Sequence, residues 1–422
     1  MTQKNLLISA VLVYLISTAA TYAIASQIMG GNGKTNSSTN TANLPAATVT
    51  PSEPATEECP INGAMYGKTA KANWEKRRPL AVVIENHTDA RPQSGISSAD
   101  VVYEAVAEGG VTRTLSIFYC QDAKRVGPIR SARVHFINIL REWGNNPLYA
   151  HVGGANCDAE TGSGCGNGAP ADALGLLRKL KWTIYNDMDQ FAISYPYYYR
   201  DYEILPDVAT EHTVYSSTQK LWEYAAKNRG LAAKDEDGLA WNSTWKPWKF
   251  QDDAAAGKRG NVKYISYDFY DVNAKDFGVR WEYDAATNSY KRFNGNKPHI
   301  DKNTDQQLAA KNVFVMLGKE SSANDDYPGG HIVYDLLKGG DLFAFQNGKE
   351  IKGTWEKEDY EEKIKFLDEN GDEIPIVRGQ VWISLIPQEN EVYSGATPKK
   401  AVSKSDESDT KTTSSKSTGS SE

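Results

Sequence analysis

The fold is indicated most clearly by residues 78–119, which read RPLAVVIENHTDARPQSGISSADVVYEAVAEGGVTRTLSIFY. Residues 79–85 form a short apolar run, which predicts a buried strand. Residues 100–107 and 111–119 are also strand-like, and the turn-forming sequence EGG at 108–110 separates them. The stretch therefore predicts one buried strand followed by a β-hairpin.

The sequence after this stretch alternates between helical and strand patterns. Gly127-Pro128 leads into the amphipathic segment 131–140, which predicts a loop followed by a helix that ends near Gly144. A strand is expected over 147–152, and two more helices over 171–180 and 213–228. We therefore expect the first half of the chain to be an α/β domain.

The pattern changes from Trp241 onward. Short β-like segments follow one another closely, and Asn347-Gly348 and Asn370-Gly371 are typical of hairpin turns. The second half is expected to be a smaller β-rich domain, an antiparallel sandwich or barrel. The fold class is α+β, with a transmembrane anchor and disordered tails.

Both ends of the chain differ in composition from its centre. Residues 6–28 carry no charge, and a helix of that length spans a hydrocarbon core of about 30 Å. We expect it to remain as a single-pass signal anchor facing outside, although Ala23-Ile24-Ala25 also fits a cleavage site. We predict five segments: the anchor over 1–29, a Ser/Thr/Asn-rich tether over 30–58, the α/β domain over 59–235, the β-rich domain over 236–395 and a disordered tail over 396–422.

The four cysteines of the chain suit an exported protein with two disulfides. Cys157 and Cys165 flank a glycine-rich loop and are expected to pair, which leaves Cys59 with Cys120. A metal site is the alternative, but the spacings do not fit the usual zinc patterns. We expect no metal ion and no cofactor.

The charge of the chain bears on its partners. A net charge of −7 argues against a nucleic-acid partner, because binding to phosphates needs a broad basic surface. A local anion site is still compatible with this charge.

The densest group of polar residues lies between residues 85 and 133. Arg130 and Arg133 bracket the expected start of a helix, where free N–H groups favour an anion and two guanidinium groups can bind a phosphate or carboxylate. Alternatively, these residues pair with one another in a partly buried network. The candidate ligand-binding residues are Glu85, Asn86, Arg91, Asp100, Glu104, Arg113, Arg130 and Arg133.

Patterns that would identify an enzyme are weak. Glu104 and Glu108 lie on a predicted strand end at a spacing that does not fix a common site. His151 is compatible with catalysis or with the end of a strand. No nucleophile elbow, zinc-protease motif or phosphate-binding loop is present, so no catalytic residue is assigned.

The motif block 78–119, followed by VGPIRSARVHF and HVGG, resembles the YerB-like envelope lipoproteins, a family whose biochemical activity is not established. Pieces of the second half, such as GQVWISLIP at 379–387, also resemble that family. The resemblance implies a two-domain surface protein and adds Ser131 to the candidate residues. This chain has no cysteine close behind its apolar segment, so the N-terminal helix would replace the lipid anchor.

Two functions are consistent with these observations. The first is a binding or regulatory protein of the cell envelope, in which the arginines bind an anionic wall component or a wall-synthesis protein. The second is a hydrolase or transferase acting on a phosphate- or sugar-containing envelope polymer, with Glu85 or Glu104 as the base. Whether the protein is an enzyme is left open, and of the two functions binding is favoured.

Overall fold

The computed structural model describes residues 53–399, which belong to one compact unit. The predicted anchor, most of the predicted tether and most of the predicted tail lie outside these residues. Among the residues that the structure describes, no helix is both long enough and apolar enough to cross a bilayer.

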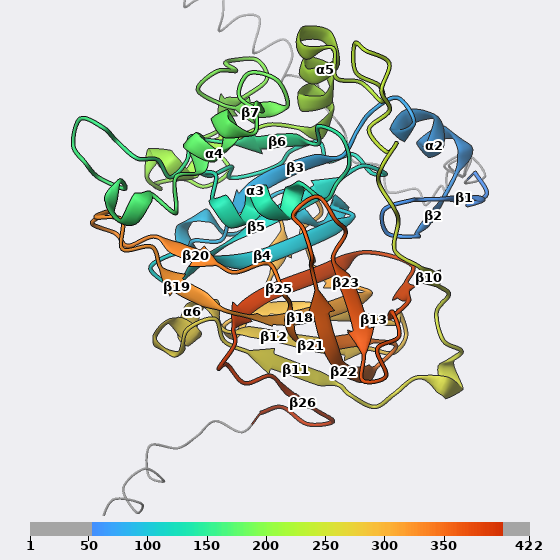
Figure 1. Cartoon of the computed structure of the whole chain (residues 1–422). Coiled ribbons are helices and arrows are strands. Elements are labelled where there is room, and N and C mark those ends of the chain that lie inside the picture. The colour runs from blue at the N-terminus through green and yellow to red at the C-terminus, as the bar shows by residue number, and fades with distance from the viewer. Residues whose placement is uncertain (1–52, 400–422) are drawn as a thin grey trace, which may run out of the picture. The chain divides into compact units, whose positions relative to one another are not determined.

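A ten-stranded mixed sheet forms the centre of the molecule (Figure 1). In spatial order its strands are β23 (Lys365–Asp368), β22 (Lys349–Glu356), β21 (Gly340–Gln346), β18 (Asn312–Gly318), β25 (Val381–Pro387), β4 (Val101–Glu108), β5 (Val111–Phe118), β3 (Leu80–Glu85), β6 (Leu148–His151) and β7 (Asp187–Asp189). Strands from both halves of the sequence therefore share one sheet.

The second sheet is antiparallel and comes entirely from the second half of the chain. Its six strands are β11 (Tyr264–Tyr267), β12 (Val279–Asp284), β13 (Ser289–Asn294), β14 (Lys297–Pro298), β17 (Ala309–Ala310) and β26 (Tyr393–Gly395). Five two-stranded pairs complete the β structure: β1 (Glu57–Glu58) with β2 (Met65–Tyr66), β8 (Tyr199–Arg200) with β9 (Val214–Tyr215), β10 (Phe250–Gln251) with β24 (Ile376–Val377), β15 (Ile300–Asp301) with β16 (Gln306–Gln307), and β19 (Glu320–Ser322) with β20 (Ile332–Tyr334).

Within residues 53–399 the α-helices are short. They are α2 (Lys68–Trp74), α3 (Val134–Leu140), α4 (Ala173–Lys179), α5 (Thr218–Arg229) and α6 (Ala274–Phe277). On one face of the central sheet, α3 and α4 pack over the strands, and we call this the helix face. On the opposite face, α5 covers the strands of the first half and the six-stranded sheet covers those of the second half, and we call this the sheet face.

The two covered faces explain the apolar run of β3. All six of its residues, Leu80 to Glu85, are buried, which is typical of a strand with layers on both sides. Leu80, Val82 and Ile84 belong to the core of the sheet face, whereas Ala81 and Val83 belong to that of the helix face. Each fully buried side chain of valine or leucine size contributes about 1.5–3 kcal/mol, so this strand stabilises both layers.

Several sequence predictions are confirmed. β4 and β5 form the expected hairpin, with Glu108 paired to Val111. Asn347-Gly348 joins β21 to β22 with both residues at positive φ, as a tight hairpin turn requires. Cys59 pairs with Cys120 and Cys157 with Cys165.

As predicted, the N-terminal domain is a mixed α/β structure and the C-terminal domain is β-rich. The prediction that the β-rich domain is a separate antiparallel sandwich or barrel is wrong, because some of its strands pair in parallel. β25 pairs in parallel with β18 and also in parallel with β4 of the first half. The second half therefore shares a sheet with the first half. The reason is that β25 is buried along both faces, so it is stable only inside a covered sheet.

The helix predicted over 131–140 begins later than expected, at Val134, and it ends at Leu140 rather than near Gly144. Ile129 and Ala132 instead bridge to Ile84 and Gly154, so residues 129–132 run as extended chain beside the sheet. This extended segment places Arg130, Ser131 and Arg133 at the end of the sheet, where the candidate site lies.

Candidate functional site

The central sheet separates the candidate ligand-binding residues into groups on its two faces. Successive side chains of a strand point to opposite faces, and the register of the paired strands decides which residues meet. Glu85 on β3 pairs with Arg113 on β5, and both alternate with residues of the sheet-face core, so they point to the helix face. Glu104 on β4 lies between Val102 and Val106 and points to the sheet face.

Apart from Glu85, which lies behind Arg130, the helix-face group lines a cavity of about 370 Å³. Arg113 reaches it from β5, and Arg130, Ser131 and Arg133 reach it from the extended segment before α3. Glu108, from the turn end of β4, pairs with Arg133 and also with Arg113, whose Nη2 lies 3.0 Å from the Glu108 carboxylate. We call this cavity the arginine cleft.

The opposite wall of the arginine cleft comes from residues that the sequence did not single out. Tyr327 and His331 stack with ring centroids 4.0 Å apart, and His331 Nδ1 lies 2.7 Å from Asp325 Oδ2. Asp158 and Ser163 reach the cleft from the loop that the Cys157–Cys165 disulfide closes. No local pattern pointed to Tyr327 or His331, because both enter the site through long-range packing.

Burial makes the arginines of the cleft unusual. The side chains of Arg113 and Arg133 are only 7% and 6% exposed. Burial lowers the pKa of each to about 10, and the charge of Arg130 also contributes at Arg113. Both are still protonated at neutral pH, so the cleft carries concentrated positive charge in a weakly hydrated place. The Nε atoms of both are buried and have no hydrogen-bond partner within residues 53–399.

Arg130 is more accessible, with 23% of its side chain exposed. Its Nε lies 3.1 Å from Glu85 Oε1, and the other carboxylate oxygen of Glu85 lies 2.8 Å from His212 Nδ1. Glu85 is thus held between two basic groups. A carboxylate in this position fits a structural or orienting role better than the role of a general base.

The helix dipole adds little to this site. The sequence predicted that Arg130 and Arg133 bracket the start of the helix, whereas Arg133 is its N-cap; α3 has only seven residues and its cap forms no side-chain hydrogen bond. The positive character of the cleft therefore comes from the guanidinium groups.

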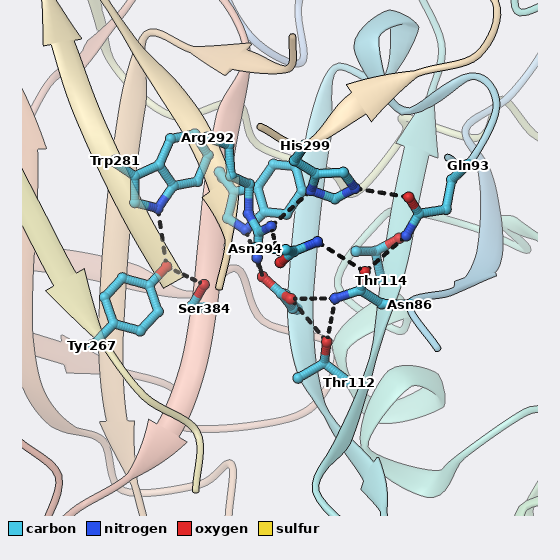
Figure 2. A network of polar contacts seen from close by, with 12 residues as sticks. Asn86, Gln93, Thr112, Thr114, Tyr267, Trp281, Arg292, Asn294, His299 and Ser384 are labelled. Atoms are coloured by element: carbon cyan, nitrogen blue, oxygen red, sulfur yellow. Dashed lines mark hydrogen bonds and ion pairs between the residues drawn. The ribbon is translucent and has the colours of Figure 1, made fainter. Parts of the chain in front are cut away.

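Asn86, Arg91 and Glu104 belong to a network on the sheet face and not to the cleft. Glu104 Oε2 lies 2.6 Å from Arg292 Nη2 of β13, and both side chains are 1% exposed or less. Figure 2 shows the side chains of Arg292, Asn294 and His299 facing those of Asn86 and Gln93 from the first half. These contacts join the six-stranded sheet to the central sheet, so the role of these residues is structural.

Arg91 closes the edge of this network. Its Nε donates to Asn86 Oδ1 at 3.0 Å and its Nη1 donates to the carbonyl of Asp276 at 2.7 Å. Its guanidinium also lies 4.8 Å from the ring centroid of Phe277. Arg91 lines a second cavity of about 640 Å³, separate from the arginine cleft.

Asp100 lies in a third place, beside the Cys59–Cys120 disulfide. It accepts hydrogen bonds from the backbone N–H groups of Tyr119 and Cys120 at 2.7 and 2.9 Å, and from Asn62 Nδ2 at 2.9 Å. Burial raises the pKa of its carboxyl to about 7. Asp100 therefore orders the segment around Cys59 and Asn62 and does not position the arginines of the cleft.

His151 is the last residue of β6 and is fully buried. Its Nε2 lies 2.7 Å from Asp187 Oδ1 and its Nδ1 lies 2.7 Å from the carbonyl of Gly153. Burial by itself lowers the pKa of His151, but the hydrogen bond to Asp187 and the charges of Asp187 and Asp189 outweigh it, so the pKa is raised. Since both ring nitrogens face acceptors, the geometry favours an imidazolium with a structural role.

Comparison with known proteins identifies relatives across most of the chain. Two family models match, described as the N-terminal domain and the C-terminal domain of a protein of unknown function, DUF3048, at residues 66–232 and 267–383. The chain is 31% identical over 330 residues to the "Putative lipoprotein YerB" of Bacillus subtilis (strain 168), which covers 78% of this chain and 86% of that protein. A crystal structure of the YerB protein from Bacillus subtilis superposes with a TM-score of 0.62 at 25% identity, covering 80% of this chain and 99% of that chain. The matches extend over both halves of the sequence.

Proposed function

The chain belongs to the DUF3048 family. We propose that it is a membrane-associated protein of the cell envelope that works outside the cytoplasm, and that its arginine cleft binds an anionic wall component. The two disulfides support an oxidising location, since such bonds are rare in the cytosol. The name of the Bacillus relative supports attachment to a membrane. In this chain the apolar segment 6–28 is the proposed anchor.

One observation carries the binding proposal: three arginines line one cavity, where Glu108 is shared by Arg113 and Arg133, Asp158 is the other carboxylate of the lining, and Arg130 pairs with Glu85 outside it. Two of these guanidinium groups are almost fully buried and keep an unpaired Nε. Desolvated positive charge is costly, and an anion entering the cleft would offset that cost with charge-assisted hydrogen bonds. Phosphate and carboxylate groups of the wall both have this chemistry, as does an acidic surface of a wall-synthesis protein.

The binding test compares cell-wall preparations that carry phosphate polymers with preparations stripped of them, in a co-sedimentation assay with the full chain. Arg130→Gln is the first variant, because the Arg130 side chain is partly exposed and its removal disturbs the core least. Hydrogen bonds to charged groups contribute about 1.5–3 kcal/mol, so we expect binding to weaken roughly 10- to 100-fold.

The matched control is Arg280→Gln, whose side chain is 26% exposed compared with 23% for Arg130 and lies on β12 of the other sheet. It should bind as the unaltered protein does. Binding should also weaken as salt rises, because exposed charges are screened. If neither Arg130→Gln nor Arg133→Gln changes wall binding, the arginine cleft is not the binding site.

A second candidate function is hydrolysis or transfer on a phosphate- or sugar-containing wall polymer. The hydrogen bond between Asp325 and His331 favours it, because an aspartate on Nδ1 fixes the imidazole tautomer that leaves Nε2 as a base. In that case the base is His331 and not Glu85 or Glu104, which are held in ion pairs. His331→Gln should then abolish turnover of the polymer and leave its binding intact, whereas a binding protein shows no turnover before or after the change.

A further inference from the structure

Two histidines from distant parts of the chain lie face to face beside Glu85. The rings of His87 and His212 stack with their centroids 5.1 Å apart and their planes within 10° of parallel. His87 precedes the short 3-10 helix η1 (Thr88–Ala90), and His212 is the last residue of the 3-10 helix η4 (Thr210–His212). Asp89 is the third member, and one ligand atom from each of the three lies within 4.8 Å of the others.

The tautomer of His212 is set by its neighbour. Glu85 is ion-paired with Arg130, and its other oxygen lies 2.8 Å from His212 Nδ1. A carboxylate only accepts hydrogen bonds, so Nδ1 carries the proton and the lone pair is on Nε2. A histidine that binds a metal through one nitrogen commonly donates its other N–H to a carboxylate in this way. His212 and Glu85 are both buried, so this arrangement is rigid.

We propose that His87, Asp89 and His212 form a binding site for a divalent transition-metal ion of the zinc class. Two imidazole nitrogens and one carboxylate are the donor set that zinc and its neighbours prefer over calcium or magnesium. Three protein ligands leave a fourth position for water or a substrate oxygen. This inference concerns a different set of side chains from the arginine cleft and does not rest on the proposed function.

Coordination requires the ring of His87 to turn out of the stack, because an imidazole binds a metal in the plane of its own ring and two parallel planes do not meet at one ion. Tetrahedral zinc ligands at about 2.1 Å from the ion lie roughly 3.4 Å apart, so ligand atoms that lie within 4.8 Å of one another must also close by up to about 1.4 Å. The side chains of His87 and Asp89 are 37% and 59% exposed and can turn without disturbing the core. If His87 binds through Nδ1, it gives up the hydrogen bond that this atom accepts from the backbone N–H of Asp89 at 3.2 Å.

Charged groups around the site also permit a cation. Arg130 is the nearest basic group that the contacts identify, and Glu85 already neutralises it. Glu211, the neighbour of His212 in η4, adds a carboxylate beside the site.

The experiment measures metal binding to the full chain, purified in mild detergent without an affinity tag and stripped with a chelator. Zinc is titrated by calorimetry in a chloride buffer free of phosphate, and cobalt is added in parallel to follow its visible absorption. We expect one equivalent of metal to bind and cobalt to give the intense bands of a low-coordinate site. His87→Ala should weaken zinc binding by at least about tenfold, and Glu85→Gln, which acts through His212, by about 10- to 100-fold.

Two controls keep the result specific. Asp237→Asn removes an exposed aspartate from another loop and should leave the affinity unchanged, whereas Asp89→Asn should weaken it. His212→Ala should also weaken binding, and its melting temperature without metal shows whether it still folds. If it does not fold, the exposed His87 carries the test. The absence of saturable zinc binding up to millimolar concentration would overturn the proposal, and so would an affinity that His87→Ala leaves unaltered. Because the titration contains neither phosphate nor a wall polymer, failure here does not bear on the arginine cleft.

Discussion

The buried ion pair between Glu104 and Arg292 predicts how the two halves of the molecule depend on each other. Glu104 comes from β4 and Arg292 from β13, so the pair joins the central sheet to the six-stranded sheet. Arg292→Met keeps most of the side-chain volume and its packing against Trp382, whose ring centroid lies 4.6 Å from the guanidinium carbon. The substitution removes the charge of the guanidinium and the hydrogen bonds that it donates.

The loss of stability depends on which contacts of Glu104 remain after the substitution. Glu104 keeps hydrogen bonds from Thr112 Oγ1 at 2.9 Å and from Trp382 Nε1 at 3.1 Å, but loses its only ion-pair partner among residues 53–399. His299 and Asn294 each lose the hydrogen bond that Arg292 donates. Breaking a buried pair from one side costs about 3–5 kcal/mol, a large fraction of the stability of an ordinary domain.

Urea unfolding monitored by tryptophan fluorescence measures this cost. We expect Arg292→Met to lower the free energy of unfolding by about 3–5 kcal/mol and Arg292→Met combined with Glu104→Gln to recover part of it, since the uncompensated charge is gone. The control Arg280→Met removes a partly exposed arginine of β12 that pairs with Glu282, and should cost less than about 1 kcal/mol. If Arg292→Met costs no more than the control, or if the two changes simply add, the ion pair does not couple the sheets.

Three further predictions concern stability. Burial lowers the pKa of His135 to about 3, from 6.5, and its ring nitrogens have no hydrogen-bond partner in the described chain. The unfolded state therefore binds a proton that the folded state excludes. The free energy of unfolding should fall as pH drops below about 6.5, by roughly 2 kcal/mol at pH 5. His135→Leu should abolish this part of the pH dependence. If the variant loses stability with falling pH as steeply as the unaltered protein, His135 is not the cause. Replacing Cys157 and Cys165 by serine opens a loop of sequence separation 8, which should lower the free energy of unfolding by roughly 2.5 kcal/mol in a thermal unfolding experiment. Because this loop lines the arginine cleft, the double variant should also bind the wall component more weakly. Gly348→Ala should lower the free energy of unfolding by about 2–4 kcal/mol, because φ is +67° and an added Cβ would lie 2.6 Å from the Tyr283 ring. Gly371→Ala, at φ +83° with open space around the added Cβ, should cost only about 1–2 kcal/mol. Equal losses of stability in the two variants would refute the steric argument.

The local parts of the fold were predictable because the signals that determine them lie close together in the sequence. The hairpin of β4 and β5 follows from two apolar runs around EGG, and the turn at Asn347-Gly348 follows from residues that accept positive φ. The disulfide of Cys157 and Cys165 follows from their proximity in the sequence.

The arrangement of the sheets was not predictable in this way. β25 reads as one more short apolar strand, and nothing within it specifies that it inserts between β18 and β4. Such pairings are determined by the packing of both faces, which no short window of sequence contains.

The candidate site was predictable only in part. The sequence found the arginines that meet in the cleft, because they lie within residues 113–133. It grouped them with Glu104 and Asn86, although the alternation of strand residues and the register of β3, β4 and β5 send these side chains to the other face. Tyr327, His331 and Arg292 were missed, since each meets its partner only after the second half has folded onto the first.

The position of β25 also constrains the order in which the chain acquires its structure. During synthesis the first half of the chain emerges first. The edge of β4 from Val101 to Glu104 then stays unpaired until β25, which ends at Pro387, has also emerged. Until about nine-tenths of the chain has been delivered, that edge can pair with any other extended segment nearby. For the export that we propose, a fast passage through the membrane or a chaperone that covers the edge of β4 would prevent such pairing until the last strands arrive.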